Sequence, residues 1–308
     1  MFTEINNSNL VCRFFVYLKE RFPVFIIVLY SVLFVAVTAC FLRLEWLPSY
    51  VLAWSRFWLV VLTIFLFFLR LRLVDEIKDN EYDLVNHPER PVARGLLKVA
   101  ELKKIIIFIL VLEVFLQFFN SFQGIVFYIV AALYSVLMAK EFFIKNYLTS
   151  HLLVALFLHQ IIFVVYVFYA ISSLAGIFSL PVGPSLLSLV FLLFSQPLLF
   201  ELGRKLDHRR DSQGLATDDT YVYRWGLNRS FALIMAVAAA QFVSLLILFK
   251  GERLVVLAPY FLFFCFIVFI FFHRRKEIST TARQWSLVLA LLGPISFLIM
   301  VALKKIYG

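Results

Sequence analysis

Charged residues are scarce in this 308-residue sequence, where Asp, Glu, Lys and Arg together make up 16% and hydrophobic residues make up 63%. The mean hydropathy of +0.94 lies far above that of a soluble globular domain. A chain with so few charges lacks the polar side chains that a water-facing surface needs, which excludes an ordinary soluble protein. The composition is typical of a protein that crosses the membrane several times.

The sequence also contains few cysteines, and its soluble segments carry no basic stripe of the kind that binds nucleic acid. Cys12, Cys40 and Cys265 are the three cysteines, and no two of them have metal-ligand spacing, so we expect neither a cysteine metal site nor a disulfide framework. No soluble segment carries a basic stripe with interleaved aromatics, which argues against a nucleic-acid partner. Residues 1–22 lack the apolar core and cleavage site of a signal peptide, and we expect a cytosolic tail there.

Long apolar runs recur along the chain, and only helices satisfy their own backbone at this length in lipid. We therefore expect an all-α integral membrane protein with nine transmembrane helices, forming a single domain over residues 1–308. The expected spans are 23–42, 50–71, 103–119, 122–138, 148–172, 184–200, 230–249, 254–272 and 285–303.

Lys and Arg are distributed unevenly between the predicted loops. With the N-terminus in the cytoplasm, 23 of the 29 basic residues fall on that side, five fall on the other, and Arg56 lies inside the second predicted span. Because cytoplasmic loops are enriched in Lys and Arg, we predict a cytoplasmic N-terminus and a C-terminus on the opposite side. The net charge of +10 is then mostly an anchor to anionic lipid in the bilayer.

Residues 70–95, here called the first island, form a dense charged segment after the second span. Asp75, Asp79 and Asp83 are spaced at i, i+4 and i+8, which places the three carboxylates in one stripe of a helix. Such carboxylates repel one another without a cation, and Mg²⁺ commonly shares a few carboxylates with substrate phosphates. Nearby cations that could meet phosphate oxygens are Arg72, Lys78, Arg90 and Arg94.

A second island, residues 201–226, follows the sixth span. Glu201, Arg204 and Lys205 share a helical face there, and Asp207 and Asp211 form an adjacent pair at i, i+4. The similar positions of the islands indicate two four-helix halves plus a ninth helix, around a central cavity that opens on the cytoplasmic side. A solvated loop with mixed charges is the alternative reading of either island.

Several polar residues fall inside predicted spans: Glu113, Gln117, His151, His159 and Gln160. Ionisable groups at membrane depth are functional candidates, here as acceptor contacts or as a base. Equally, such side chains can simply hydrogen-bond a neighbouring helix.

The first island resembles the first motif of the UbiA superfamily of intramembrane prenyltransferases, which reads N-D-x-x-D-x-x-x-D followed by R-P-x-x-x-G. The matching residues are Asp75, Asp79 and Asp83, followed by Arg90, Pro91 and Gly95. Asp75 replaces the leading Asn and Glu76 the next Asp, a variant that looks like a bacterial branch related to 4-hydroxybenzoate polyprenyltransferases. The resemblance covers nearly the whole chain, with Lys140 after span four and a looser second motif in which Lys205 stands near Glu201.

This resemblance implies a Mg²⁺-dependent enzyme that transfers a prenyl group from an isoprenyl diphosphate to a lipophilic, aromatic acceptor in quinone or related lipid synthesis. It implies catalytic roles for Asp75, Asp79 and Asp83. The implied metal ligands are Asp75, Asp79, Asp83, Glu201, Asp207 and Asp211. The implied diphosphate-binding residues are Arg72, Lys78, Arg90, Arg94, Lys140, Arg204 and Lys205. A bacterial inner membrane is the expected location.

Two other readings stay open from the sequence. The same ionisation of a diphosphate could serve a non-aromatic acceptor, such as a sugar phosphate, or an intramolecular cyclisation. A protein of another class, a transporter or a non-catalytic scaffold, is the further alternative. A transporter should carry charges or broken helices near the membrane centre, whereas these carboxylates cluster at helix ends.

Overall fold

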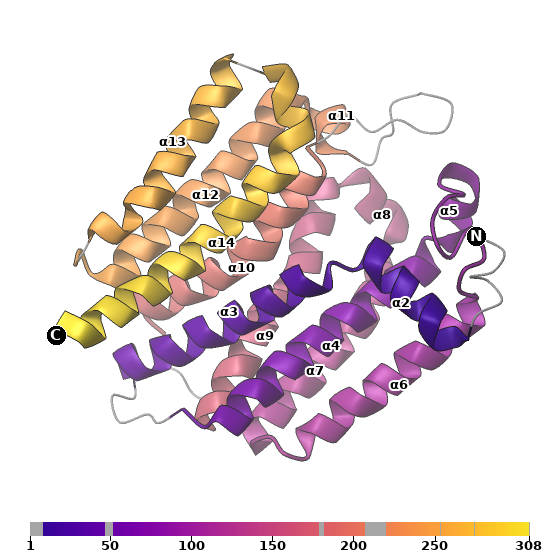
Figure 1. Cartoon of the computed structure of the whole chain (residues 1–308), viewed down its shortest axis with the longest axis horizontal. Coiled ribbons are helices and arrows are strands. Elements are labelled where there is room, and N and C mark those ends of the chain that lie inside the picture. Colours follow the sequence, from indigo (N-terminus) through magenta and orange to yellow (C-terminus); the bar gives the residue numbers. More distant parts are fainter. Residues whose placement is uncertain are drawn as a thin grey trace.

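The computed structural model describes residues 9–46, 52–178, 182–206, 220–252, 254–273 and 275–307. Over these residues the chain is helical and contains no β-strand, which confirms the predicted all-α class. Long helices lie side by side in one bundle, and short helices gather at one of its ends (Figure 1).

The N-terminal part of the bundle contains four long helices. They are α3 (Val24–Phe41, extended by the π-helical turn η1, Leu42–Trp46), α4 (Trp54–Lys78), α6 (Val99–Gln117) and α7 (Phe122–Ala139). The C-terminal part contains five more. They are α9 (Leu152–Ala175), α10 (Pro184–Arg204), α12 (Leu227–Phe249), α13 (Ala258–His273, preceded by η3, Leu254–Leu257) and α14 (Arg275–Tyr307).

Eight of these helices are long and apolar enough to cross a membrane. The predicted span 103–119 does form a helix, α6, but this helix is not among the eight because it carries too many charges. Its charged residues are Glu101, Lys103, Lys104 and Glu113. A multi-pass membrane protein is therefore confirmed, while the number nine stays a prediction.

Helix α14 joins the two parts of the bundle. It packs against α10, α12 and α13 on one side and against α3 on the other. On the opposite side of the bundle α4 and α9 are in contact, and α9 also packs on α7 and α10. The predicted ninth helix is thus not an addition to two separate halves, because it connects the beginning of the chain to its end.

One end of the bundle, here called the charged end, holds the short helices α2 (Leu10–Arg21), α5 (Asn80–Asn86), α8 (Lys145–Ser150) and α11 (Tyr221–Trp225). Figure 1 shows these helices near the N mark and the C-terminus at the opposite end. The helices α4, α7 and α10 all end there, since every second span of a meandering bundle runs in the same direction. The described parts of both islands, residues 70–95 and residues 201–206 with 220–226, therefore lie at one end, as predicted, while the membrane side that this end faces stays a prediction.

The expected cytosolic tail is packed against the bundle from Leu10 onward. Tyr17 of α2 is fully buried, and Phe22 beside it is also buried. Arg13 donates hydrogen bonds to both carboxylate oxygens of Glu101, at 3.0 and 2.7 Å. Helix α2 thus covers the ends of α4 and α6 next to the first island.

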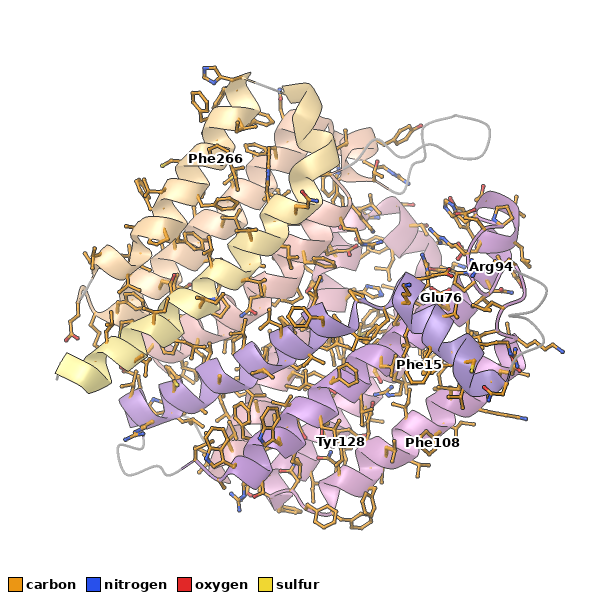
Figure 2. All side chains as sticks on the ribbon, in the orientation of Figure 1. Phe15, Glu76, Arg94, Phe108, Tyr128 and Phe266 are labelled. Carbon is orange, nitrogen blue, oxygen red and sulfur yellow. The ribbon has the colours of Figure 1, made fainter. Side chains whose placement is uncertain are left out.

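Polar residues inside the spans mostly connect helices. Arg70 of α4 donates from Nε to Glu113 of α6 at 3.0 Å and from Nη1 to Ser135 of α7 at 3.1 Å. Tyr128 also donates to Glu113, at 3.0 Å. Glu113 therefore connects α6 to α4 and α7 through hydrogen bonds, which is the second of the two roles considered for polar residues inside the spans. By contrast, Phe108 of α6 and Phe266 of α13 are exposed on opposite flanks, as expected for lipid-facing residues (Figure 2).

Candidate active site

The end of α4 carries the first two carboxylates of the predicted stripe. Helix α4 ends at Lys78 and α5 begins at Asn80, so Asp79 lies at a junction rather than within one continuous helix. Its backbone stays close to helical, because the Asp79 amide donates to Asp75 and the Asp83 amide donates to Asp79, at 2.9 and 2.8 Å. The three aspartates therefore still succeed one another by about one helical turn.

Asp75 and Asp79 are exposed and, within the described part of the chain, have neither an ion pair nor a side-chain hydrogen bond. Surrounding protein nevertheless partly desolvates Asp79, which raises the pKa of its carboxyl group, while the neighbouring Lys78 opposes this shift. Two adjacent carboxylates without partners are an arrangement that a cation would stabilise. They are the strongest candidates for ligands in the first island.

The carboxylates of Asp83 and Glu76, unlike those of Asp75 and Asp79, are paired with arginines. Asp83 is 3% exposed and accepts a hydrogen bond from Arg90 Nη1 at 2.5 Å. Glu76 is 2% exposed beneath α2, where it pairs with Arg72 and accepts from Arg21 Nε at 2.9 Å (Figure 2). Within the described residues, no three carboxylate, His or Cys side chains converge on one point. The structure thus brings Asp75 and Asp79 together and gives Asp83 a separate structural partner.

The remaining cations of the first island are also held by acidic partners. Arg94 donates to both carboxylate oxygens of Glu20 on α2, at 2.9 and 2.7 Å, and to the Glu89 carbonyl at 2.8 Å. Lys78 forms an ion pair with Glu141. Of the predicted diphosphate-binding residues, Arg72, Arg90 and Arg94 therefore fix the island itself, whereas Lys78 lies next to the free carboxylates.

Glu141 is a site residue that the sequence analysis missed. It lies in the turn η2 (Glu141–Phe143) after α7, and its second carboxylate oxygen is 3.6 Å from His159 Nε2 of α9. Together with Lys78 it links three helices beside Asp75, which also interacts electrostatically with His159. Its position directly after the predicted Lys140 was the available signal, but the contact to Lys78 spans 63 positions of sequence and cannot be read locally.

The end of α10 pairs its carboxylate with cations. Glu201 accepts two hydrogen bonds from Arg204, at 2.9 and 2.8 Å, and lies 3.4 Å from Lys205 Nζ. Lys205 also sits over the ring of Tyr221, with Nζ 5.4 Å from the ring centroid. Burial raises the pKa of the Tyr221 hydroxyl, so this ring is a neutral contact. Over the described residues 201–206, one carboxylate is thus shared by two cations.

The ends of α4 and α10 both lie at the charged end, and Asp75 of α4 contributes to the electrostatic environment of Arg204 of α10. Asp207 and Asp211, the remaining predicted ligands of the second island, lie outside the described residues. Lys140, after α7, is exposed and lies in a cavity together with Lys145 of α8. The described site therefore combines two free carboxylates on α4 with two cations on α10.

Comparisons with known proteins support the fold. No family model and no curated protein matches the chain. The structure is similar to the solved structure of a digeranylgeranylglyceryl phosphate synthase, with a TM-score of 0.61 and 14% sequence identity. The similarity covers 94% of this chain and 98% of the synthase. At this identity the likeness shows a shared fold, that of a membrane-embedded helical bundle.

Proposed function

We propose that this protein is a membrane prenyltransferase of the UbiA type, which transfers a prenyl group from an isoprenyl diphosphate to a lipophilic acceptor. The observation that carries the proposal is the pair of carboxylates without a side-chain partner in the described residues, Asp75 and Asp79, at the same end of the bundle as Arg204 and Lys205 of the second island. The fold shared with a digeranylgeranylglyceryl phosphate synthase supports it independently. An anionic half and a cationic half are what a magnesium diphosphate complex would need.

Two of the described carboxylates could serve as ligands of Mg²⁺. Mg²⁺ is usually bound by one or two carboxylates together with substrate phosphates and water, so Asp75 and Asp79 suffice as protein ligands. Asp83, predicted as a third ligand, is instead neutralised by Arg90. The ion would supply electrostatic stabilisation of the negative charge that develops on the leaving diphosphate.

The protein's own cations would bind the diphosphate from the other side. Arg204 is held by Glu201 through two hydrogen bonds, which fix the orientation of its guanidinium at the end of α10. Lys205 is a compact charge held between Glu201 and the Tyr221 ring. Lys78, on the α4 side, completes a set of three cations that could stabilise charge on the leaving group.

The acceptor remains the open part of the proposal. We propose a lipophilic aromatic acceptor, as in quinone or related lipid synthesis. A non-aromatic acceptor is the second candidate, because the enzyme of similar fold is named for a glyceryl phosphate product. A transporter fits less well, since the unpaired carboxylates lie at a helix end and the deeply buried Arg70 and Glu113 neutralise each other.

The direct test is an assay of the purified protein in lipid nanodiscs. Labelled isoprenyl diphosphates of several chain lengths would be incubated with aromatic and glyceryl phosphate acceptors, and released diphosphate and prenylated product measured. We expect both products with Mg²⁺ and neither after chelation with EDTA, with activity restored by excess Mg²⁺. Absence of turnover with every donor and acceptor, in protein that is folded by calorimetry, would contradict the enzyme assignment.

A further inference from the structure

Helix α2 (Leu10–Arg21) has an inner face that is attached to the bundle. Tyr17 is fully buried at the centre of this face, in an apolar cluster with residues of α4 and α6. Ion pairs made by Arg13, Glu20 and Arg21 extend the attachment to α6 and to the first island. The inner face therefore has its partners within the chain.

The outer face of α2 is divided into two edges. Val11 and Phe15 are 61% and 65% exposed, and Leu18 beside them is partly exposed. At i, i+4 and i+7 these three side chains form one strip, here called the apolar strip. Cys12 and Glu20 are also exposed. Because a helix turns by about 100° per residue, these two lie toward the other edge.

The position of α2 along the bundle is that of a membrane interface. Only two residues separate its end from the candidate span Val24–Trp46. The ring of Phe22, the first of these two residues, packs edge-on against Phe65, with 5.8 Å between the ring centroids. Phe65 lies inside another candidate span, Trp54–Lys78. Figure 1 shows α2 lying across α4 and α6 near the charged end rather than parallel to them.

A lipid surface is the partner that fits the apolar strip. Phe15 lies on the same flank of the bundle as Phe108, an exposed apolar residue of α6 (Figure 2). The exposed apolar surface continues at the start of α3, where Phe25 is 79% exposed. A helix with an apolar edge and a charged remainder lies in the plane of the membrane interface. Three side chains are also too few for a stable protein–protein interface, which buries about 800 Å² on each partner.

We propose that α2 is an interfacial helix, whose apolar strip binds the acyl-chain boundary at the surface of the bilayer. Cys12 and Glu20 face the water side of this boundary. The contact is apolar, so it requires no particular head-group charge. It places residues 10–21 of the expected cytosolic tail on the membrane and lets the lipid surface help to hold α2 against the first island. The inference does not depend on the proposed prenyl transfer.

Site-directed spin labelling in lipid nanodiscs tests this placement. Single nitroxides would be attached to the full-length protein at Val11→Cys, Phe15→Cys, Glu20→Cys or the natural Cys12, each in a background without other cysteines. Power saturation compares collisions with O₂, which dissolves in lipid, with collisions with a water-soluble nickel chelate. We expect the ratio of O₂ to nickel collisions to be several-fold higher at positions 11 and 15 than at positions 12 and 20.

Two results of the labelling would overturn the proposal. Equal nickel access at all four positions would show that the whole outer face of α2 is in water. Low access of both reagents at positions 11 and 15 would show that protein, such as a second copy of the chain, covers the apolar strip. A thermal melt of each labelled protein would show that it is folded.

Hydrogen exchange of unlabelled variants in nanodiscs gives an independent measurement. Phe15→Ser should lower the protection of the α2 amides about tenfold, because the apolar contact of the ring with lipid is lost. Phe and Ser have similar helix propensities, so propensity does not account for such a loss. Phe15→Leu should keep most of the protection, and Cys12→Ser, the matched control, should keep all of it. Wild-type protection of α2 in a folded Phe15→Ser variant would overturn the proposal.

Discussion

The two islands look alike in sequence, yet their described residues pair their carboxylates differently. At the end of α4, Asp75 and Asp79 have no side-chain partner in the described part of the chain. At the end of α10, the carboxylate of Glu201 is shared by Arg204 and Lys205. Two similar patterns therefore need not form two equivalent half-sites. Under the proposed function, the first half would bind the metal ion and the second the phosphates that accompany it.

The two islands can form two halves of one site only if both face the same side of the membrane. Single cysteines at Asn86 and Gln213 should be protected from an impermeant thiol reagent in intact cells, while one at Gly251 should be labelled. The background would lack Cys12, Cys40 and Cys265. An all-or-none difference is expected, because the bilayer blocks the reagent. Labelling at one island but not at the other would separate the two half-sites.

The free carboxylates should give the largest kinetic effect. Asp75→Asn and Asp79→Asn should each lower Mg²⁺-dependent diphosphate release by about 100-fold or more, since charge stabilisation at the leaving group is lost. Glu81→Gln, which removes an exposed carboxylate of α5, is the control and should retain activity. Wild-type turnover in both aspartate variants would remove the first island from the mechanism.

The buried ion pair next to the first island should give a large effect on stability. Arg70→Ala would leave Glu113, which is fully buried, without its cation. Breaking such a pair costs about 3–5 kcal/mol, whereas replacing both partners with apolar residues costs less. Thermal unfolding should therefore show a larger loss for Arg70→Ala than for Arg70→Met/Glu113→Leu. Equal losses would indicate that the pair acts mainly through packing.

The cationic half should give a moderate effect on donor binding. Lys205→Ala should raise the KM for the isoprenyl diphosphate about tenfold, the equivalent of about 1.4 kcal/mol, and Lys205→Arg should retain part of the affinity. If Lys205 instead only neutralises Glu201, the Glu201→Gln/Lys205→Gln double variant should recover most of the activity that either single change loses. Unchanged kinetics in Lys205→Ala would make this lysine a solvated anchor.

The smallest expected effect concerns α2, which braces the first island only. The hydrogen bonds from Arg13 lower the pKa of Glu101, so the folded state favours the ionised carboxylate. This contribution to stability is present above the ordinary carboxyl pKa of 4.5 and is lost as the pH falls below it. The protection factors of the α2 amides, which are exchange rates corrected for the intrinsic pH dependence, should fall at low pH in the wild type. Glu101→Gln should show low protection of α2 at both pH values.

Sequence reasoning identified the helices well because the bilayer sets their length and composition. It located the charged end for the same reason, since cations and carboxylates are excluded from the apolar runs. It could not assign partners, because the contacts are distant in sequence. Arg21 and Glu76 are 55 positions apart, and Arg94 and Glu20 are 74 positions apart. Helix α6 was placed correctly, but its charges, including Glu113, find partners on α4 and α7 that no local pattern reveals.

The contact between α3 and α14 has a consequence for how the protein is made. Among the described helices, the first long one thus has the last one as a direct neighbour. During synthesis α3 can pack on α4 and α9 early, but its face toward α14 stays without its protein neighbour until α14 has been inserted. A chain that stops before α14 would therefore leave faces of both α3 and α10 without the helix that covers them.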